Sequence, residues 1–506
     1  MHRLGRGDAS CRRRLHAVLS PVRALLQGRF FMSFIFRTAR SPAAQHVNRA
    51  ASRAALAARF IVIVLALHAP SWLSAWIFQA PRAEERPLFN LDLLLGAAIA
   101  CVSSLGGAIV LVLAWAADGA RSAAKNYHFM STVDFVDAAR FADMLNLPAL
   151  FSRSLLGALA GALVCLWLVL RLTRRSRQLA LPLLALAVLA AGCDIANGSF
   201  HLFGLDKDKR AVSLNFAGSP AWNVWASERQ SLQAAGPGAR ITNPVTYRAL
   251  QTWQAEHPGR TSLLVLVESM GLPRDPALRG WLQGRLMTSR LAARWEMQFS
   301  EEAFSGSTTF GELRTLCGLH VHYSRLDDEL AAGCLPRQQA AQGMSSIGIH
   351  GFGLRMFDRS TWWPRVGLRP WNWLEGDAPK SMNCNPAFPG VCDVDVLAQA
   401  VKQAQEPRRF VYALTLDTHL PLDLKRLPPL PVDLLKACSA SSTPLEACQL
   451  TRQLGDLLAR LESLLAASAA TPFLVVVGDH APPFSERFNR EAFATDRVPL
   501  FVLKPR

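Results

Sequence analysis

Two segments of the chain end apolar runs with side chains that bind divalent cations. Glu268 directly follows one run, and Asp479 and His480 follow another run that breaks at Gly478. Carboxylate oxygens and an imidazole nitrogen are suitable ligands for one divalent ion. Taken alone, Glu268 is more often a surface acid or a helix N-cap. Together the three side chains predict a metal site, for which we consider manganese, zinc and magnesium.

A third segment, residues 304–319, supplies a candidate nucleophile. Its sequence FSGSTTFGEL is typical of a loop that leads into a helix. The hydroxyls of Thr308 and Thr309 would lie near the N-terminus of that helix, which stabilises anions. A hydroxyl beside a divalent cation can become an alkoxide nucleophile. Because Ser and Thr are also common N-caps, this prediction depends on the metal ligands lying nearby.

Short apolar runs alternate with helical stretches in this part of the chain, as in a sheet of buried parallel strands. The predicted fold class is α/β, with a mostly parallel central sheet covered by helices on both faces. Chemistry in such sheets lies at the carboxyl ends of the strands, where Glu268 and the Asp479–His480 pair occur. The predicted strands are residues 262–267, 346–350, 410–415, 473–477 and 498–503, and the clearest helices are 395–405 and 445–466.

The region before the sheet divides into a membrane domain and a linker. Residues 58–198 are the predicted transmembrane domain, with about four spans, and five as the alternative. Residues 199–260 are polar with Pro and Gly punctuation, which predicts a linker with one or two surface helices. The catalytic domain is predicted to be residues 261–506. The four apolar runs that could cross a bilayer are 60–80, 93–117, 154–170 and 179–193.

The net charge of +17 is concentrated beside these spans. Residues 1–59 carry twelve Arg and one Asp, and four more Arg lie between 171 and 177. Arg clusters next to apolar runs are typical of cytoplasmic flanks, so we interpret the charge as topology and predict no nucleic-acid partner. A basic cytoplasmic arm is predicted over residues 1–57.

Four spans leave this topology inconsistent. A cytoplasmic N-terminus followed by four spans returns the chain to the cytoplasm, whereas a cytoplasmic 171–177 turn places the C-terminal domain outside. One further span or re-entrant segment would resolve the conflict, and the candidates are residues 30–36 and 127–147. We predict a multi-pass protein of the cytoplasmic (inner) membrane with an extracytoplasmic, periplasmic catalytic domain.

Cysteine usage supports an oxidising compartment. Six of the ten cysteines follow residue 316, and they form three couples of short spacing without the CxxC pattern of zinc sites. The alternative is six reduced thiols. The predicted disulfides are Cys317–Cys334, Cys384–Cys392 and Cys438–Cys448.

Taken together, these residues resemble the alkaline phosphatase and sulfatase superfamily, and within it the membrane enzymes of the lipoteichoic acid synthase and phosphoethanolamine or phosphoglycerol transferase type. The resemblance covers about residues 260–505 and the plan of N-terminal spans before an extracytoplasmic catalytic domain. It implies Thr308 as the nucleophile, because the family loop places it about four residues before an acidic position, here Glu312. It also implies one catalytic metal ion with the ligands Glu268, Thr308, Asp479 and His480.

Two weaker motifs extend the resemblance. His350 and Gly351 followed by Phe357 and Arg359 resemble the group that binds the phosphate head group, and an Arg guanidinium suits bidentate phosphate binding. His419, in the segment LDTHLPL, matches a loop whose His contacts the substrate or the leaving group. Four Trp residues could line an entrance for glycan or lipid, with core packing as the default; they are Trp362, Trp363, Trp371 and Trp373.

No CxPxR motif, which sulfatases convert to formylglycine, occurs near Thr308. The resemblance therefore favours transfer of a phospho-alcohol head group, phosphoethanolamine or phosphoglycerol, over sulfate-ester hydrolysis. The implied donor is a phospholipid, and the implied acceptor is an envelope glycan or lipid, with a phospho-Thr308 intermediate. The alternatives are a hydrolase of phosphate or sulfate esters and a catalytically inactive envelope scaffold.

Overall fold

The computed structural model describes residues 42–77, 87–126, 132–150, 153–174, 176–196, 216–233, 240–241, 243–374, 379–424, 427–484 and 486–506. The apolar stretch 30–36 and most of the predicted basic arm lie outside the described residues. The chain divides into two units, residues 1–62 and 63–506. All the candidate site residues belong to the second unit.

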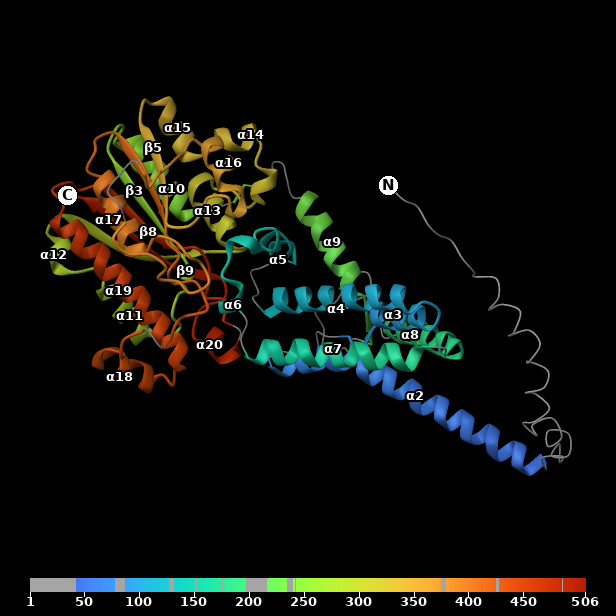
Figure 1. Cartoon of the computed structure of the whole chain (residues 1–506). Helices are drawn as coiled ribbons and strands as arrows, with labels where there is room; N and C mark the ends of the chain where they lie inside the picture. The colour runs from blue at the N-terminus through green and yellow to red at the C-terminus, as the bar shows by residue number, and fades with distance from the viewer. Residues whose placement is uncertain are drawn as a thin grey trace, which may run out of the picture. The chain divides into compact units, whose positions relative to one another are not determined.

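Seven strands form the central sheet of the C-terminal part: β3 (Ser262–Val267), β4 (Trp295–Ala303), β5 (Ser345–His350), β6 (Arg369–Pro370), β7 (Arg409–Leu414), β8 (Phe473–Gly478) and β9 (Arg497–Pro505). Their order is β4-β9-β8-β3-β7-β5-β6. Figure 1 labels four of these strands, β9, β8, β3 and β5. Neighbours from β8 to β6 are parallel, whereas β9 is antiparallel to both β8 and β4. The prediction of a mostly parallel sheet is therefore confirmed.

All five predicted strands are present, and β4 and β6 were not predicted. Strand β4 has the sequence WEMQFSEEA and pairs only with β9, at one edge of the sheet. An edge strand is not enclosed on all sides, so its sequence lacks the continuous apolar run of a buried strand. Strand β6 has two residues, too few to leave a recognisable pattern.

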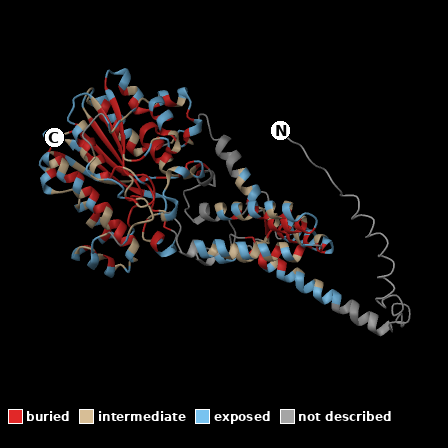
Figure 2. Ribbon diagram, in the orientation of Figure 1, coloured by how far each residue is buried: buried red, intermediate tan, exposed pale blue. Residues whose placement is uncertain are grey.

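Helices cover both faces of the sheet. Alternate residues of β3 point to opposite faces, so Leu263 and Val265 join one apolar cluster, and Leu264 and Leu266 join another. The first cluster includes residues of α11 (Pro276–Gly284), α17 (Asp393–Gln403) and α19 (Leu445–Ala467). The second includes residues of α10 (Val245–Glu256), α13 (Thr308–Cys317), α15 (Leu335–Ala341) and α16 (Arg359–Arg365). Figure 2 shows the buried strands between these two layers.

Helix α10 lies within the stretch predicted as a linker, yet it packs on the sheet. Trp253 stacks on Phe473 of β8 with ring centroids 4.7 Å apart, and Leu250 is fully buried. Four further helices of this part have four to nine residues: α12 (Ser289–Ala292), α14 (Asp328–Ala332), α18 (Val432–Ala440) and α20 (Arg487–Glu491).

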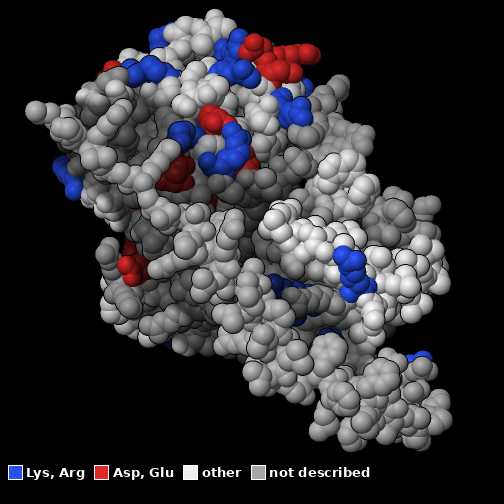
Figure 3. All heavy atoms as spheres, turned by 45° about the vertical axis from the view of Figure 1, so that its right-hand side comes forward, with Lys and Arg blue, Asp and Glu red and all other residues white. Residues whose placement is uncertain are grey.

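Four helices among the described residues are long and apolar enough to cross a membrane. They are found in α2 (Pro42–Ile77), α4 (Ser104–Asn126), α7 (Arg153–Thr173) and, with the turn before it, α8 (Ala180–Ala196). Their 18-residue windows hold at most two charged residues. In Figure 3 the acidic and basic side chains gather mainly on the upper part of the visible surface. Membrane anchoring is the consequence.

The prediction of one span over residues 93–117 is wrong. The run is broken at Cys101–Ser103 into a short apolar helix, α3 (Leu91–Ala100), and the longer α4. A side chain at Gly107 would lie 2.4 Å from the backbone of Ala100, and one at Gly96 would lie 2.9 Å from Leu111. At both positions the two helices are in close contact, so α3 and α4 form a tight antiparallel hairpin. Small residues at the contact allow this packing.

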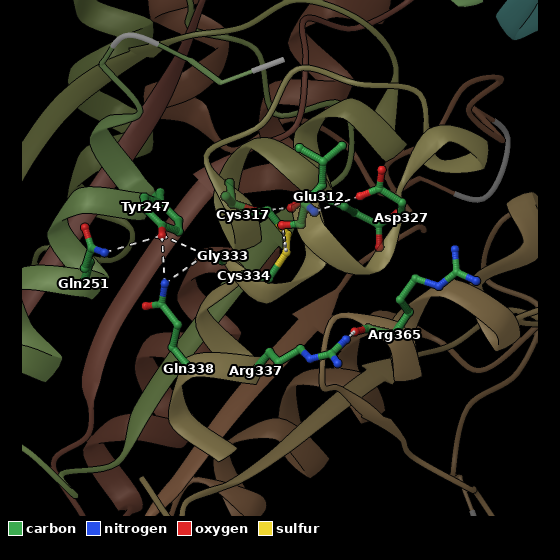
Figure 4. Close-up of a disulfide and its surroundings, with 12 residues drawn as sticks. Tyr247, Gln251, Glu312, Cys317, Asp327, Gly333, Cys334, Arg337, Gln338 and Arg365 are labelled. Atoms are coloured by element: carbon green, nitrogen blue, oxygen red, sulfur yellow. Dashed lines mark hydrogen bonds between the residues drawn. A yellow bond between two sulfur atoms is a disulfide. The ribbon is translucent and has the colours of Figure 1, made fainter. Parts of the chain in front are cut away.

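The three predicted disulfides are confirmed: Cys317–Cys334, Cys384–Cys392 and Cys438–Cys448. Figure 4 shows that the first joins the last residue of α13 to the segment before α15. Beside it, the Tyr247 hydroxyl of α10 donates to the carbonyl of Gly333 at 2.8 Å. The C-terminal end of α13 is thereby fixed to the segment before α15, which is itself hydrogen-bonded to α10.

Candidate active site

The ends of four adjacent parallel strands bring the predicted site residues to one edge of the sheet. Val267 is in register with Gly478, and Leu266 and His350 are each in register with Leu414. The residues after these positions therefore leave the sheet side by side. This edge carries Glu268 after β3, Asp479 and His480 after β8, His350 at the end of β5, and His419 after β7.

Glu268, Asp479 and His480 form a buried group that could hold a metal ion. One ligand atom from each lies within 4.8 Å of the others, and the three residues are 1%, 0% and 4% exposed. His480 Nε2 lies 3.2 Å from Asp479 Oδ2 and 3.6 Å from Glu268 Oε1. Two carboxylates and an imidazole at these spacings match the ligand set predicted from sequence.

The chemistry of the group fits a cation. Asp479 Oδ2 is buried without a hydrogen-bond partner, which is costly for a carboxylate oxygen unless a cation satisfies it. Burial, with the nearby charge of Glu268, raises the pKa of Asp479 to about 7. Two carboxylates this close repel each other when both are ionised, and a divalent ion would remove that repulsion.

Hydrogen bonds fix the orientation of these ligands. His480 Nδ1 lies 2.8 Å from the carbonyl of Ala481, so the tautomer with its proton on Nδ1 leaves Nε2 directed at the group. Asp479 Oδ1 accepts from the backbone amides of Ser269 at 2.8 Å and His480 at 2.6 Å. Ser269 has φ 55°, a left-handed conformation that turns its amide toward Asp479 directly after Glu268.

The hydroxyl of Thr308 lies beside Glu268 and His480. Thr308 is the first residue of α13, and its Oγ1 lies 3.1 Å from Glu268 Oε2 and 3.3 Å from His480 Nε2. Thr309 is 2% exposed, and its Oγ1 lies 3.4 Å from Ser307 Oγ. The geometry supports Thr308 over Thr309 as the nucleophile.

Two residues of helix α13 pack against the loop that carries Asp479 and His480. A side chain at Gly311 would lie 3.1 Å from Asp479 Cβ, so only glycine allows this approach without adjustment. Arg314 donates from Nη2 to the carbonyl of Gly478 at 2.7 Å and from Nη1 to that of Asp479 at 3.1 Å. Arg314 was not predicted from the sequence, because an Arg two residues after Glu312 has no distinguishing pattern.

Arg359 lies in a buried ion pair with Glu312. Its Nε and Nη2 lie 2.9 Å and 2.8 Å from Glu312 Oε2, and the two side chains are 4% and 0% exposed. Trp363 Nε1 donates to the other oxygen of Glu312 at 3.0 Å. The guanidinium is also 5.4 Å from the ring centroid of Phe357, whose φ of 55° is left-handed. Binding of phosphate by Arg359 stays a prediction, and in this structure the guanidinium binds Glu312.

Two histidines lie at the same edge of the sheet, and both are neutral at physiological pH. Burial lowers the pKa of His350 to about 3, with the charge of Arg359 adding to the effect. Burial also lowers the pKa of His419 to about 4. The Nδ1 atoms lie 3.0 Å from the carbonyl of Leu414 and 2.6 Å from that of Leu420, respectively, which leaves each Nε2 as an acceptor.

The predicted His-Gly pair has a steric basis. A side chain at Gly351 would lie 2.1 Å from the carbonyl oxygen of Val391, and one at Gly390 would lie 2.4 Å from the carbonyl oxygen of Gly351. The Val391 amide donates to Gly351 O at 2.8 Å. Two segments of backbone therefore cross in contact directly after His350.

Asp393 and Asp417 fix the loop that carries His419. Asp393 accepts from the amides of Leu416 and Asp417, and Asp417 accepts from the amide of Asp393 at 2.7 Å. Burial raises the pKa of Asp417 to about 6, and burial with the charge of Asp417 raises the pKa of Asp393 well above its usual value. Asn385, beside the Cys384–Cys392 disulfide, donates to the carbonyl of His419 at 2.6 Å.

A segment far upstream in the sequence reaches the same site. It comprises α5 (Thr132–Ala139), the turn η2 (Ala142–Met144) and α6 (Leu147–Leu150). Asp134 accepts from Ser307 Oγ at 3.0 Å, directly before the candidate nucleophile. Asp137 accepts from Tyr323, and although burial alone would raise its pKa, hydrogen bonds from His322, Tyr323 and Arg140 lower it. Nothing in the sequence around Asp134 distinguishes it from an ordinary polar connection.

Two of the four Trp residues are core residues. Trp362 and Trp363 are 3% and 0% exposed, and Trp363 packs against Tyr412 of β7. Trp371 and Trp373 are partly buried against the apolar cluster that includes α11, α17 and α19. Trp373 Nε1 donates to the carbonyl of His350 at 2.9 Å. An entrance lined by Trp362 and Trp363 is therefore excluded.

Comparison with protein-family models and with curated proteins finds no match. Among solved structures, the chain is similar to a protein in the alkaline phosphatase superfamily from Vibrio parahaemolyticus, with 15% sequence identity and a TM-score of 0.36. The similarity covers 49% of this chain and 60% of that one.

Two further structures have similar scores. The lipoteichoic acid synthase LtaP from Listeria monocytogenes is 16% identical with a TM-score of 0.31, covering 55% of this chain and 71% of that chain. Phosphoglycerol transferase GacH from Streptococcus pyogenes, in complex with sn-glycerol-1-phosphate, is 17% identical with a TM-score of 0.31, covering 52% and 78%.

Proposed function

We propose that this chain is a membrane-bound, metal-dependent transferase of the alkaline phosphatase and sulfatase superfamily. It moves a phospho-alcohol head group, phosphoethanolamine or phosphoglycerol, from a phospholipid donor to a hydroxyl of an envelope glycan or lipid. The observation that carries the proposal is the Thr308 hydroxyl, 3.1 Å from Glu268 and 3.3 Å from His480, beside the unpartnered Asp479 Oδ2. A hydroxyl nucleophile beside a buried carboxylate oxygen that accepts no hydrogen bond suits metal-assisted covalent catalysis.

Glu268, Asp479 and His480 would hold the ion, with Thr308 as the fourth ligand. When bound, a manganese, zinc or magnesium ion would lower the pKa of the Thr308 hydroxyl and neutralise charge on the phosphoryl oxygens. Thr308 Oγ1 forms a bond to phosphorus, and the bond from phosphorus to the diacylglycerol oxygen breaks. The departing oxygen takes up a proton equivalent to the one Thr308 has lost.

The second half of the reaction reverses the roles. The acceptor hydroxyl bonds to phosphorus and its proton goes to a base. The bond to Thr308 Oγ1 breaks, and Oγ1 takes up an equivalent proton, which restores the hydroxyl. His419 suits the role of base, because Nδ1 is held by the carbonyl of Leu420, which leaves Nε2 to accept a proton. The N-terminus of α13 would stabilise the phosphoryl oxygens through its free amides.

The α3–α4 hairpin supports an outward-facing catalytic domain. If α3 counts as a crossing, the chain crosses the membrane five times, with α2, α3, α4, α7 and α8. A cytoplasmic N-terminus and a cytoplasmic Arg171–Arg177 turn then agree with an extracytoplasmic catalytic domain. Helix α3 is about 15 Å long, and residues 87–90 before it extend its reach toward the ~30 Å of a bilayer core. Three disulfides favour the same side.

Intact-mass analysis of the full chain in detergent tests the function. The protein is incubated with Mn²⁺ and either phosphatidylethanolamine or phosphatidylglycerol, and the adduct is then located by peptide mapping. We expect the mass of phosphoethanolamine or glycerophosphate on Thr308. Thr309→Ala is the matched control and should keep the adduct, whereas Thr308→Ala should lose it.

The alternatives correspond to other results. Release of the head group without any acceptor, at the rate of adduct formation, would assign a hydrolase. Absence of an adduct from wild-type protein that binds Mn²⁺ would overturn the proposal with these donors. Absence of Mn²⁺ binding itself would favour an inactive scaffold.

A further inference from the structure

The segment Thr132–Leu150 contacts the rim of the site at several points. Beyond Asp134 and Asp137, Arg140 lies 3.4 Å from Asp358, and the Phe141 ring is 5.6 Å from that of Phe357. The amide of Asn146 donates to the carbonyl of Ala387 at 2.9 Å. Polar and aromatic contacts thus connect this segment to the nucleophile loop, to the loop after α13 and to the segment before α16.

The contact with Ser307 is the one closest to the chemistry. Ser307 is the N-cap of α13, a position where a Ser hydroxyl ordinarily accepts from the first turn of its own helix. Here it makes no such capping bond, and it donates instead to Asp134 Oδ1 at 3.0 Å. Asp134 is 6% exposed, so the bond is shielded from water. A carboxylate at this end of α13 is also favoured by the helix dipole.

The position of Thr308 depends on the backbone that Ser307 leads into. Thr308 is the next residue, and its Oγ1 must reach both Glu268 and His480. The other end of α13 is fixed by the Cys317–Cys334 disulfide, and its middle by Arg314. The Asp134–Ser307 bond is the corresponding restraint at the N-terminal end.

We propose that Asp134, supplied by the segment between α4 and α7, is a positioning residue for the nucleophile. Through Ser307 it holds the start of α13 so that Thr308 faces the metal-ligand group. The inference rests on the proposed function, because it assigns Thr308 as the nucleophile. It also means that the site is completed by a part of the chain outside the predicted catalytic domain.

The test compares variants of the full chain in detergent with Mn²⁺ and the donor that labels wild-type Thr308. Asp134→Ala and Ser307→Ala should each slow single-turnover adduct formation on the order of 100-fold, as for a displaced reacting group. Donor affinity should be unchanged. Asp134→Asn should keep most of the rate, because its amide oxygen can still accept from Ser307. The matched control is Asp143→Ala, which removes an exposed pair with Arg355 in the same segment and should react like wild type.

A double-mutant cycle separates positioning from general destabilisation. The Asp134→Ala/Ser307→Ala variant should be no slower than the slower single variant, because both remove one interaction. Losses that multiply would show that the two residues act independently and would overturn the proposal. So would an Asp134→Ala rate equal to that of Asp143→Ala.

A second measurement does not need activity. Hydrogen–deuterium exchange of the amides of residues 309–312 should increase in Asp134→Ala and stay unchanged in Asp143→Ala. Unchanged exchange in Asp134→Ala would overturn the positioning role. A wild-type protein that forms no adduct would contradict the proposed function alone, and the exchange measurement would still decide whether Asp134 orders the start of α13.

Discussion

Arg359 and Glu312 form an enclosed ion pair at the edge of the candidate site, with Arg359 Nη2 2.8 Å from Glu312 Oε2. Burial raises the pKa of Glu312, and the charge and hydrogen bonds of Arg359 oppose that increase. Neither group has access to water that could replace its partner. The pair joins α13, which begins with Thr308, to the start of α16.

Removing one member of this pair should be strongly destabilising. Arg359→Met leaves the Glu312 carboxylate buried without its cation, at a cost of about 3–5 kcal/mol in the free energy of unfolding. Denaturant unfolding of the detergent-solubilised chain measures this loss in the free energy of unfolding. Arg487→Met removes a surface pair with Glu491 and should cost less than about 1 kcal/mol. Equal losses of unfolding free energy in Arg359→Met and Arg487→Met would contradict the conclusion that burial makes the Arg359–Glu312 pair costly to break.

Arg314 should control metal affinity without being a ligand. Arg314→Met releases the carbonyls of Gly478 and Asp479, so the ligand loop loses its support from α13. We expect Mn²⁺ affinity, measured by calorimetric titration, to fall about 10–100-fold. Arg294→Met is the matched control, because Arg294 also donates to several backbone carbonyls, away from the site. A full loss of affinity in that control would indicate general unfolding instead.

The Asp393–Asp417 pair predicts a fall in stability with rising pH. The pKa of Asp417 is about 6 in the folded chain, above its usual value, so the folded state binds more protons than the unfolded state. This contribution is present below pH about 4 and is lost as the pH rises through about 6. Asp417→Asn should flatten that part of the profile of unfolding free energy against pH. A profile as steep as that of wild type would exclude the pair as its cause.

The five-crossing topology can be tested by thiol labelling of intact cells. In a variant without the cysteines that form no disulfide, Ser463→Cys on the exposed surface of α19 should react with a membrane-impermeant maleimide. Ser103→Cys and Gln178→Cys, both at exposed positions, should react only after permeabilisation. Labelling of Ser103→Cys in intact cells would remove α3 as a crossing.

Much of the catalytic fold could be predicted from the sequence, because buried parallel strands leave continuous apolar runs and their ends mark the ligands. Glu268, Asp479 and His480 were predicted in this way, and the structure brings them together with Thr308. Strand β4 could not be predicted, because an edge strand needs no such run. The hairpin of α3 and α4 was missed since three residues, Cys101–Ser103, are as apolar as the helices they separate.

The contributions of Asp134 and Arg314 could not be predicted for a different reason. Each acts through contacts between segments more than 160 residues apart in the chain, and neither residue is marked by its neighbours in sequence. Local patterns report burial and capping, whereas these contacts depend on the complete tertiary structure. For the same reason, the pairing of Arg359 with Glu312 could not be predicted from local sequence patterns.

The crossing of Gly351 and Gly390 has a consequence for recognising relatives of this chain. Any side chain at either position would meet a backbone oxygen within 2.4 Å, whether or not the protein is an enzyme. The proposed metal ligands, by contrast, would be needed for the proposed chemistry. Descendants that had lost catalysis would be free to exchange Glu268 or Thr308 while keeping both glycines, so in an alignment the glycine pair would trace ancestry and the ligands would trace activity.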